Sequence, residues 1–268
     1  HRAEIAHSFY SNMIESIYSK AQQSKYEIIP MISFEDHEKE IEAIKTLVSM
    51  KVDGVIISLS SQTSSTETFE RLQQENKLPI VMIDRVLNKE KFDSITSNGE
   101  DMMDKLVSEL KNKSYKNIAY LGGLPNSDLA VVRKQGFLNA IKKHYLSNSN
   151  VTSYDEGLGE QHGYDTLKKL HKEGKLPEVF VCVNDSVAFG IYQAAKELQL
   201  SIPSDVAVTG IGNLFPSDLL SPGLTTFSLP IQDMGRKAVE LLLEKINNPS
   251  EKVSNLVFEG ELVSRGSI

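Results

Sequence analysis

Apolar residues in this chain gather in short runs, and stretches of helical periodicity separate these runs. In the clearest case, apolar runs at 179–183 and 206–211 flank a helix whose apolar residues share one face. Parallel strands joined by a helix bring their carboxyl ends to one sheet edge, which is where ligands bind in open α/β sheets. We therefore expect Asn184 and Asn213 to lie at one edge, and Asp185 to cap the helix between them.

The same alternation extends over the rest of the chain. Further helices are expected at 8–23, 36–50, 66–74, 100–110, 129–143, 160–171 and 233–246. Further strands or short extended segments are expected at 26–32, 55–59, 79–83, 94–96, 117–121, 151–154, 224–228 and 257–263. Pro30 lies inside the first of these strands and removes a ladder donor, which places that strand at or near a sheet edge. This number of strands exceeds what one open sheet usually holds.

The sequence therefore predicts an α/β fold of two doubly wound parallel-sheet lobes, joined by three short crossovers near Ser97, Phe227 and Pro249. The expected bounds are 1–97 plus 228–253 for the N-terminal lobe, and 98–227 plus 254–268 for the C-terminal lobe. A doubly wound lobe normally starts with its central strand, whereas this chain starts on a helix. Either the first strand is absent from this sequence or the first lobe is built differently.

Composition narrows the function classes. The 268 residues include 29 basic and 36 acidic side chains, and the net charge of −7 argues against nucleic-acid binding by this segment alone. Apolar runs are far shorter than the ~18 residues that cross a membrane. The single cysteine, Cys182, lies inside an apolar strand, where a buried and unreactive thiol is expected. The chain opens without the apolar leader of a signal peptide, although a removed signal would leave the same start.

Motifs of cofactor, metal and nucleophile chemistry are weak. Gly210-Ile211-Gly212 lacks the third glycine of a dinucleotide loop, because Phe215 stands at that position. The phosphate-binding pattern GxxxxGK[ST] and the nucleophile pattern GxSxG do not occur. Four histidines lack metal-ligand spacing and are expected on the solvated surface: His37, His144, His162 and His171. The run 35–40 is expected to be a solvated helix start. We therefore expect no enzyme activity, no metal and no cofactor.

Polar residues at the expected strand ends suit a polyhydroxylated ligand. Carboxylate, guanidinium and amide groups hydrogen-bond adjacent hydroxyls at two points, and such groups occur at Asp84, Arg133, Asn184 and Asn213. Phe9 and Tyr10 would cover the apolar face of a sugar ring. Each residue also has a purely structural interpretation: Asp84 as a turn residue, Arg133 as a solvated helix residue paired with Asp128, and Asn184 as a helix cap. Position alone leaves both interpretations open.

Several longer runs carry a family resemblance. They read VDGVII at 52–57, PIVMIDR at 79–85, NIAYLGG at 117–123, RKQGF at 133–137, VNDSVAFG at 183–190, IPSDVAVTG at 202–210, LTT at 224–226, MGRKA at 234–238 and LVSRGS at 262–267. Over nearly its whole length the chain resembles the effector-binding core of the LacI/GalR family of bacterial sugar-responsive repressors. The resemblance implies a type I periplasmic-binding-protein-like fold with a ligand cleft between the lobes.

The resemblance also implies a set of effector contacts. Carried over residue by residue, they are Phe9, Tyr10, Ser58, Asp84, Ser97, Arg133, Asn184, Gly212 and Asn213. Two departures affect the effector: the common GFDD turn reads GIGN at 210–213, and the usual Asp-Asn pair reads Ser97-Asn98. The GIGN turn resembles repressors of the disaccharide type. The family's helix-turn-helix domain, hinge helix and first core strand are absent from this sequence.

Two function classes follow from these expectations. The first is the sensor core of a cytoplasmic transcriptional repressor. It would bind a small sugar, with a disaccharide or a sugar phosphate as candidates, act as a homodimer without membrane contact, and reach operator DNA only through an N-terminal domain missing here. The alternative is an exported sugar-binding protein of an ABC transporter with the same fold. The sequence leaves open the identity of the sugar, the operator, and whether the effector induces or co-represses.

Overall fold

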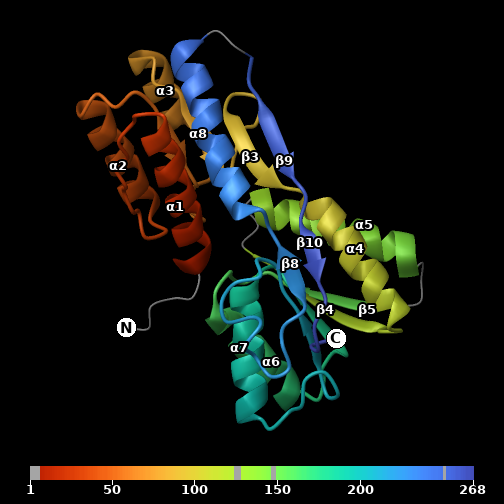
Figure 1. The fold of residues 1–268 in the computed structure, drawn as a ribbon. Helices are drawn as coiled ribbons and strands as arrows, with labels where there is room; N and C mark the ends of the chain where they lie inside the picture. The colour runs from red at the N-terminus through yellow and green to blue at the C-terminus, as the bar shows by residue number, and fades with distance from the viewer. Residues whose placement is uncertain (1–6, 124–127, 146–148, 250–251) are drawn as a thin grey trace.

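The computed structural model describes residues 7–123, 128–145, 149–249 and 252–268 as two α/β lobes (Figure 1). The helices are α1 His7–Gln23, α2 His37–Ser49, α3 Glu67–Asn76, α4 Gly99–Asn112, α5 Asp128–Tyr145, α6 Glu160–Lys172, α7 Asp185–Glu197 and α8 Ile231–Asn247. The strands are β1 Val55–Ile57, β2 Ile80–Ile83, β3 Asp93–Ser97, β4 Asn117–Leu121, β5 Asn150–Tyr154, β6 Val179–Cys182, β7 Ala207–Thr209, β8 Thr226–Ser228, β9 Asn255–Phe258 and β10 Glu261–Val263.

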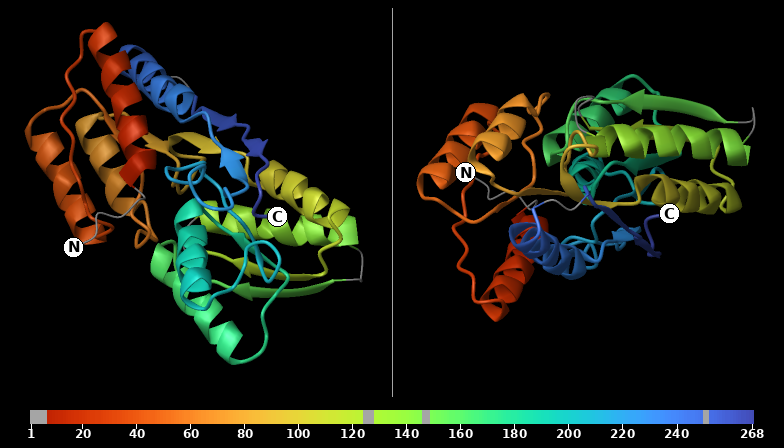
Figure 2. Two further views of the ribbon diagram at one scale, coloured as in Figure 1. Left: turned by 60° about the horizontal axis from the view of Figure 1, so that its bottom comes forward. Right: turned by 90° about the horizontal axis from the view of Figure 1, so that it is seen from above.

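The first lobe is built on a parallel sheet with the order β1-β2-β3-β9. Helices α1 and α8 cover one face of this sheet, and α2 and α3 cover the other (Figure 2). Side chains alternate between the two faces along β2. Ile80 and Met82 pack with the α2 and α3 core around Phe69, whereas Val81 and Ile83 pack with the α1 and α8 core around Met234. A strand buried on both faces needs a continuous apolar run, which this one supplies.

The second lobe repeats this arrangement on a parallel sheet with the order β5-β4-β6-β7. Along β6, Val179 and Val181 join the core that includes α4 and α5, and Phe180 and Cys182 join the core that includes α6 and α7. The predicted strand–helix–strand unit is thus confirmed as β6, α7 and β7. The predicted fold of two parallel-sheet lobes is confirmed as well.

The chain passes between the lobes at three places. It leaves the first sheet after β3 and returns between β8 and α8, near the expected positions. The third passage was expected near Pro249, but β9 still pairs with β3 in the first sheet. The chain instead crosses at Glu259-Gly260, after which β10 pairs antiparallel with β8. The expected strand at 257–263 is therefore two strands in two sheets. The lobe bounds stated above stay a prediction.

The strand expected at 26–32 is wrong, because the structure places no strand in this segment. Pro30 removes one ladder donor, and the edge strand β1 pairs with no described strand other than β2. The segment's apolar side chains are correspondingly uncovered: Ile29 is 47% exposed, Met31 is 44% exposed and Ile32 is 69% exposed. None of the described helices is long and apolar enough to span a membrane.

Two glycines set the close packing of α6 against α7. A Cβ atom added at Gly190 would lie 1.8 Å from the Glu160 carbonyl oxygen, and one added at Gly163 would lie 2.0 Å from the Val187 carbonyl oxygen. Both obstacles are backbone atoms, which cannot move aside as a flexible side chain can. These helices therefore approach more closely than any residue larger than glycine permits.

We expect Gly190→Ala to lower the free energy of unfolding by about 2–3 kcal/mol or more, because the helices must separate to admit the methyl group. Urea denaturation followed by circular dichroism measures the change. Gly159→Ala is the matched control, since a Cβ there meets no atom within 4 Å. Equal midpoints for the two variants would show that α6 and α7 do not need the contact.

Candidate functional site

Three of the predicted site residues meet at the carboxyl end of the first sheet. The Tyr10 hydroxyl on α1 donates a hydrogen bond to Asp84 Oδ2 at 3.0 Å and lies 3.3 Å from Ser58 Oγ. Ser58 follows β1 and Asp84 follows β2, so the parallel pairing of these strands brings the two residues together. The Phe9 ring packs edge-on against the Tyr10 ring, with ring centroids 5.2 Å apart.

The turn after β2 contains an aspartate and an arginine that have different partners. Asp84 has a left-handed backbone with φ of 65°, which Asp adopts more readily than most residues. Its backbone N–H donates to the Ile95 carbonyl at 2.9 Å. Arg85 instead contacts both carboxylate oxygens of Glu35, at 2.7 and 2.6 Å. Burial raises the pKa of the Asp84 carboxyl, and the positive charges of Arg85 and Arg133 act against this rise.

Arg133 on α5 is a buried residue, with 4% of its surface exposed. Its Nη1 donates to the Val183 carbonyl at 2.7 Å, and its buried Nε finds no hydrogen-bond partner among the described residues. Burial lowers the pKa of Arg133, and the negative charge of Asp84 opposes that effect. The alternative of a solvated helix residue paired with Asp128 is therefore wrong. Asp128 pairs with Lys89 instead, at 3.2 Å.

A small cavity of about 20 Å³ lies between the two lobes. Its walls are Asp84, Lys89, Thr96 and Ser97 from the first lobe and Gly99, Asp128, Leu129, Val132 and Arg133 from the second. This volume holds about one water molecule. A sugar is several times larger, so its binding requires these two walls to move apart.

Asn184 and Asn213 lie at neighbouring strand ends, as expected, but outside this cavity. Asn184 is the cap of α7: its Oδ1 accepts from the Val187 N–H and its Nδ2 donates to the Leu158 carbonyl, both at 2.9 Å. Asn213 Oδ1 accepts a hydrogen bond from Arg265 Nη2 at 2.7 Å. Both amides thus already have protein partners.

Asp185 does not cap α7, contrary to expectation, because the preceding asparagine takes that position. Asp185 is fully buried and accepts hydrogen bonds from the Leu214 N–H at 2.7 Å, from Ser217 Oγ at 2.9 Å and from Thr226 Oγ1 at 2.5 Å. Burial raises the pKa of this carboxyl, and the three donors oppose the rise. Asp185 therefore fixes the turn at Gly212, whose φ of 134° favours glycine.

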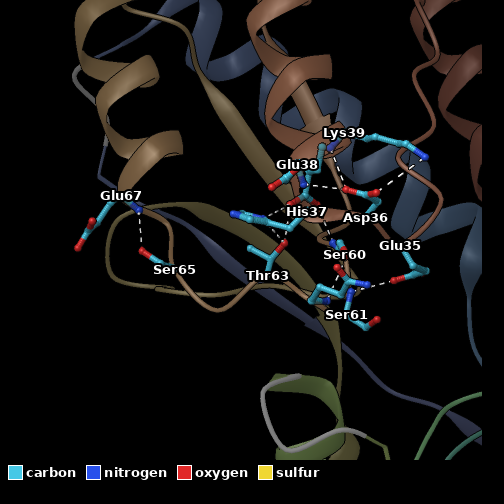
Figure 3. A network of polar contacts seen from close by, with 12 residues as sticks. Glu35, Asp36, His37, Glu38, Lys39, Ser60, Ser61, Thr63, Ser65 and Glu67 are labelled. Carbon is cyan, nitrogen blue, oxygen red and sulfur yellow. Dashed lines mark hydrogen bonds and ion pairs between the residues drawn. The ribbon is translucent and has the colours of Figure 1, made fainter.

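The first lobe has a similar buried acid, Glu40, which was not expected from the sequence; Figure 3 shows its partners Ser60 and Thr63 beside the start of α2. Glu40 on α2 is 3% exposed, and its carboxylate accepts from the Ser60 N–H at 2.6 Å and from Thr63 Oγ1 at 2.5 Å. The run 35–40 is therefore more than a solvated helix start. One signal was present: Glu40 is four residues before Ile44 and so shares its inward face. Glu40 anchors the loop that continues from Ser58.

Two predictions about single side chains have opposite outcomes. Cys182 is fully buried, as expected, and burial raises the pKa of its thiol well above its usual value. His162 was expected on the surface but is 8% exposed, with Nε2 3.2 Å from the Tyr154 carbonyl oxygen.

Among the described residues, no group of three or more His, Cys, Asp or Glu side chains is arranged to hold a metal ion.

The geometry can be compared with known proteins. Residues 107–268 match the periplasmic binding protein-like domain. The chain belongs to this family. Over 266 residues it is 26% identical to the HTH-type transcriptional repressor PurR of Glaesserella parasuis, covering 97% of this chain and 77% of that protein. It is also 26% identical, over 262 residues, to the ribose operon repressor of Escherichia coli, covering 97% of this chain and 78% of that protein.

A solved structure of a LacI family regulator, CCPA from Weissella paramesenteroides with bound sucrose, has a TM-score of 0.85 with 23% identity, covering 97% of this chain and 94% of that chain. Together with the curated relatives, it confirms the resemblance to the effector-binding core of LacI-type regulators.

We expect Glu40→Ala to lower the free energy of unfolding by about 2–3 kcal/mol, because the Ser60 N–H and the Thr63 hydroxyl lose a charged acceptor in a buried place. Urea denaturation measures it. Glu42→Ala removes an exposed carboxylate from the same helix and should change stability by less than about 0.5 kcal/mol. A loss no larger for Glu40→Ala than for Glu42→Ala would contradict the anchoring role.

Proposed function

We propose that this chain is the sugar-sensing core of a LacI-type transcriptional regulator, and that a small sugar binds between its lobes. The observation that carries the proposal is the pair Asp84 and Arg133. Each is under a tenth exposed, each comes from a different lobe, and both line one cavity. A carboxylate accepts hydrogen bonds from neighbouring hydroxyls, and a guanidinium donates two in parallel. Polar groups this deeply buried need partners, and sugar hydroxyls would supply them.

The relatives support the same ligand class. One is named for ribose, and one solved structure holds sucrose. Both curated relatives are named as repressors, which favours a regulator over the exported sugar-binding protein of a transporter and over an enzyme. A repressor acts on DNA, which supports a cytoplasmic location. Operator contact would come from a domain outside this chain, since this segment carries a net charge of −7.

The proposed site residues divide by distance from the cavity. Asp84, Ser97 and Arg133 line it. The Tyr10 hydroxyl contacts Asp84, and Ser58 contacts the Tyr10 hydroxyl. The Phe9 ring packs against the Tyr10 ring. The remaining proposed contacts, Asn184, Gly212 and Asn213, would reach a ligand only in a wider cleft. A sugar that contacts both lobes binds one lobe arrangement more tightly than another. Its binding therefore shifts the protein toward that arrangement, by as much as the two affinities differ.

We expect Arg133→Ala to weaken sugar binding by about 1.5–3 kcal/mol, as for a lost charge-assisted hydrogen bond. Calorimetric titration of ribose and sucrose measures the affinity, and a thermal melt checks the fold, because the Val183 carbonyl also loses its donor. Arg133→Lys should recover only part of the affinity, since an ammonium cannot make the two-point contact. Arg236→Ala, an exposed arginine on α8, is the control. Affinity within a factor of two of the unmodified chain would contradict the role of Arg133.

We also propose that the chain forms a homodimer through faces of both lobes away from the cavity. Exposed apolar side chains are present on each lobe: Ile14 and Tyr18 on α1, and Phe215 and Leu219 after β7. Exposed apolar side chains of this kind mark a protein interface where they join into one patch. We expect light scattering at micromolar concentration to give twice the 29.8 kDa monomer mass. Leu219→Glu should shift the mass toward the monomer. A monomer for the unmodified chain would count against the dimer.

A further inference from the structure

Four charged side chains line the interlobe cavity, and their charges cancel. Asp84 and Lys89 come from the first lobe, and Asp128 and Arg133 come from the second. Lys89 Nζ lies 3.2 Å from Asp128 Oδ2, so this ion pair connects the two lobes across the cavity. The Lys89 backbone is itself held in place, because its carbonyl accepts a hydrogen bond from Asn255 at 2.9 Å.

Nearby cations outside the cavity wall are also matched with carboxylates. Arg85 contacts both carboxylate oxygens of Glu35, and Lys134 pairs with Asp155. The four residues before Asp128 carry no charge in the sequence, LPNS. The first turn of α5 favours a negative charge, and Asp128 already supplies one there.

We propose that the cleft takes an uncharged sugar, and that the Asp128 carboxylate, which also keeps Lys89 paired, excludes phosphorylated or acidic sugars. This inference rests on the proposed sugar-sensing function. An anionic ligand would either lie beside Asp84 and Asp128 or separate Lys89 from Asp128, and each choice leaves a like-charge contact or an unmatched charge. A neutral sugar creates neither a like-charge contact nor an unmatched charge, because its hydroxyls donate to carboxylates and accept from Arg133. Selection of this kind works by penalising the wrong ligand.

Calorimetric titration of matched ligand pairs tests the proposal: ribose against ribose 5-phosphate, and sucrose against sucrose 6-phosphate. For any pair that binds, the unmodified chain should prefer the neutral member by at least about tenfold, the size expected for a like-charge contact at the cavity wall. Asp128→Asn removes one carboxylate and releases Lys89. It should raise the affinity for the phosphate ester relative to that for the neutral sugar by about tenfold.

Two variants match the charge changes at a distance from the cavity. Asp104→Asn also removes a carboxylate, one that pairs with Lys143 on the second lobe. Lys91→Gln removes a cation from the same loop as Lys89, one that pairs with Glu70. Neither should change the ratio of neutral to phosphorylated ligand. Lys89→Gln should widen that ratio, because it leaves Asp128 unmatched.

The outcomes separate the two proposals. Equal or tighter binding of a phosphate ester by the unmodified chain overturns the exclusion and leaves sugar sensing intact. An unchanged ratio in Asp128→Asn, or an equal change in Asp104→Asn, overturns the part assigned to the Lys89–Asp128 pair. If no member of either pair binds, the sugar-sensing proposal fails for these ligands, and the exclusion of anions fails with it.

Discussion

Two opposite charges, buried on facing walls of one cavity, are the feature on which the proposed chemistry of this molecule depends. Asp84 and Arg133 have lost most of their contact with water. A buried charge is costly unless other groups match it and hydrogen-bond to it. Protein groups supply only some of the hydrogen bonds that these charges need. Tyr10 donates to Asp84, and the Val183 carbonyl accepts from Arg133. Arg133 Nε has no partner in the described part of the chain. The remaining hydrogen-bonding capacity points to a polar ligand between the lobes.

Two further buried carboxylates keep the surrounding loops in place. Glu40 holds the loop that continues from Ser58 in the first lobe, and Asp185 holds the turn at Gly212 in the second. Each accepts a hydrogen bond from a backbone N–H, and Glu40 accepts one more from a hydroxyl while Asp185 accepts two. Groups that position a site are best fixed by supporting hydrogen bonds on rigid elements, and helices α2 and α7 provide those elements here.

The pattern of apolar runs along the sequence was enough to predict most of the fold. Runs such as 179–183 are apolar throughout because they are buried on both faces, and this made the parallel sheets predictable. The segment 26–32 is largely apolar as well, yet a strand also requires a partner strand within pairing distance, and a sequence pattern does not show partners. The third crossover was misplaced for a similar reason, since only the pairing of β9 with β3 shows that the chain is still in the first lobe.

The site was predictable in its residue types and less so in its contacts. Asp84 follows β2 and Arg133 lies on α5, so the two residues come from different lobes, as expected. The burial of Glu40 and His162 was missed, because a charged or polar residue on an apolar helix face is read as solvated unless its partners are known. Those partners, Ser60 and the Tyr154 carbonyl, are distant in sequence or separated by a turn.

The Lys89–Asp128 pair and the buried charges must contribute differently to lobe closure. Lys89 and Asp128 keep 39% and 31% of their side chains exposed, and ion pairs exposed to this degree are worth only about 0–1 kcal/mol. Such a pair does not hold two lobes together against the entropy of their motion. It can still disfavour an anion, because a negative ligand in the cavity meets the Asp128 carboxylate at short range or separates it from Lys89. The lobe arrangement that a ligand favours then depends on the ligand's own hydrogen bonds to Asp84 and Arg133. On this proposal, an uncharged sugar supplies those hydrogen bonds, and the Asp128 carboxylate at the cavity wall disfavours sugars with a negative charge.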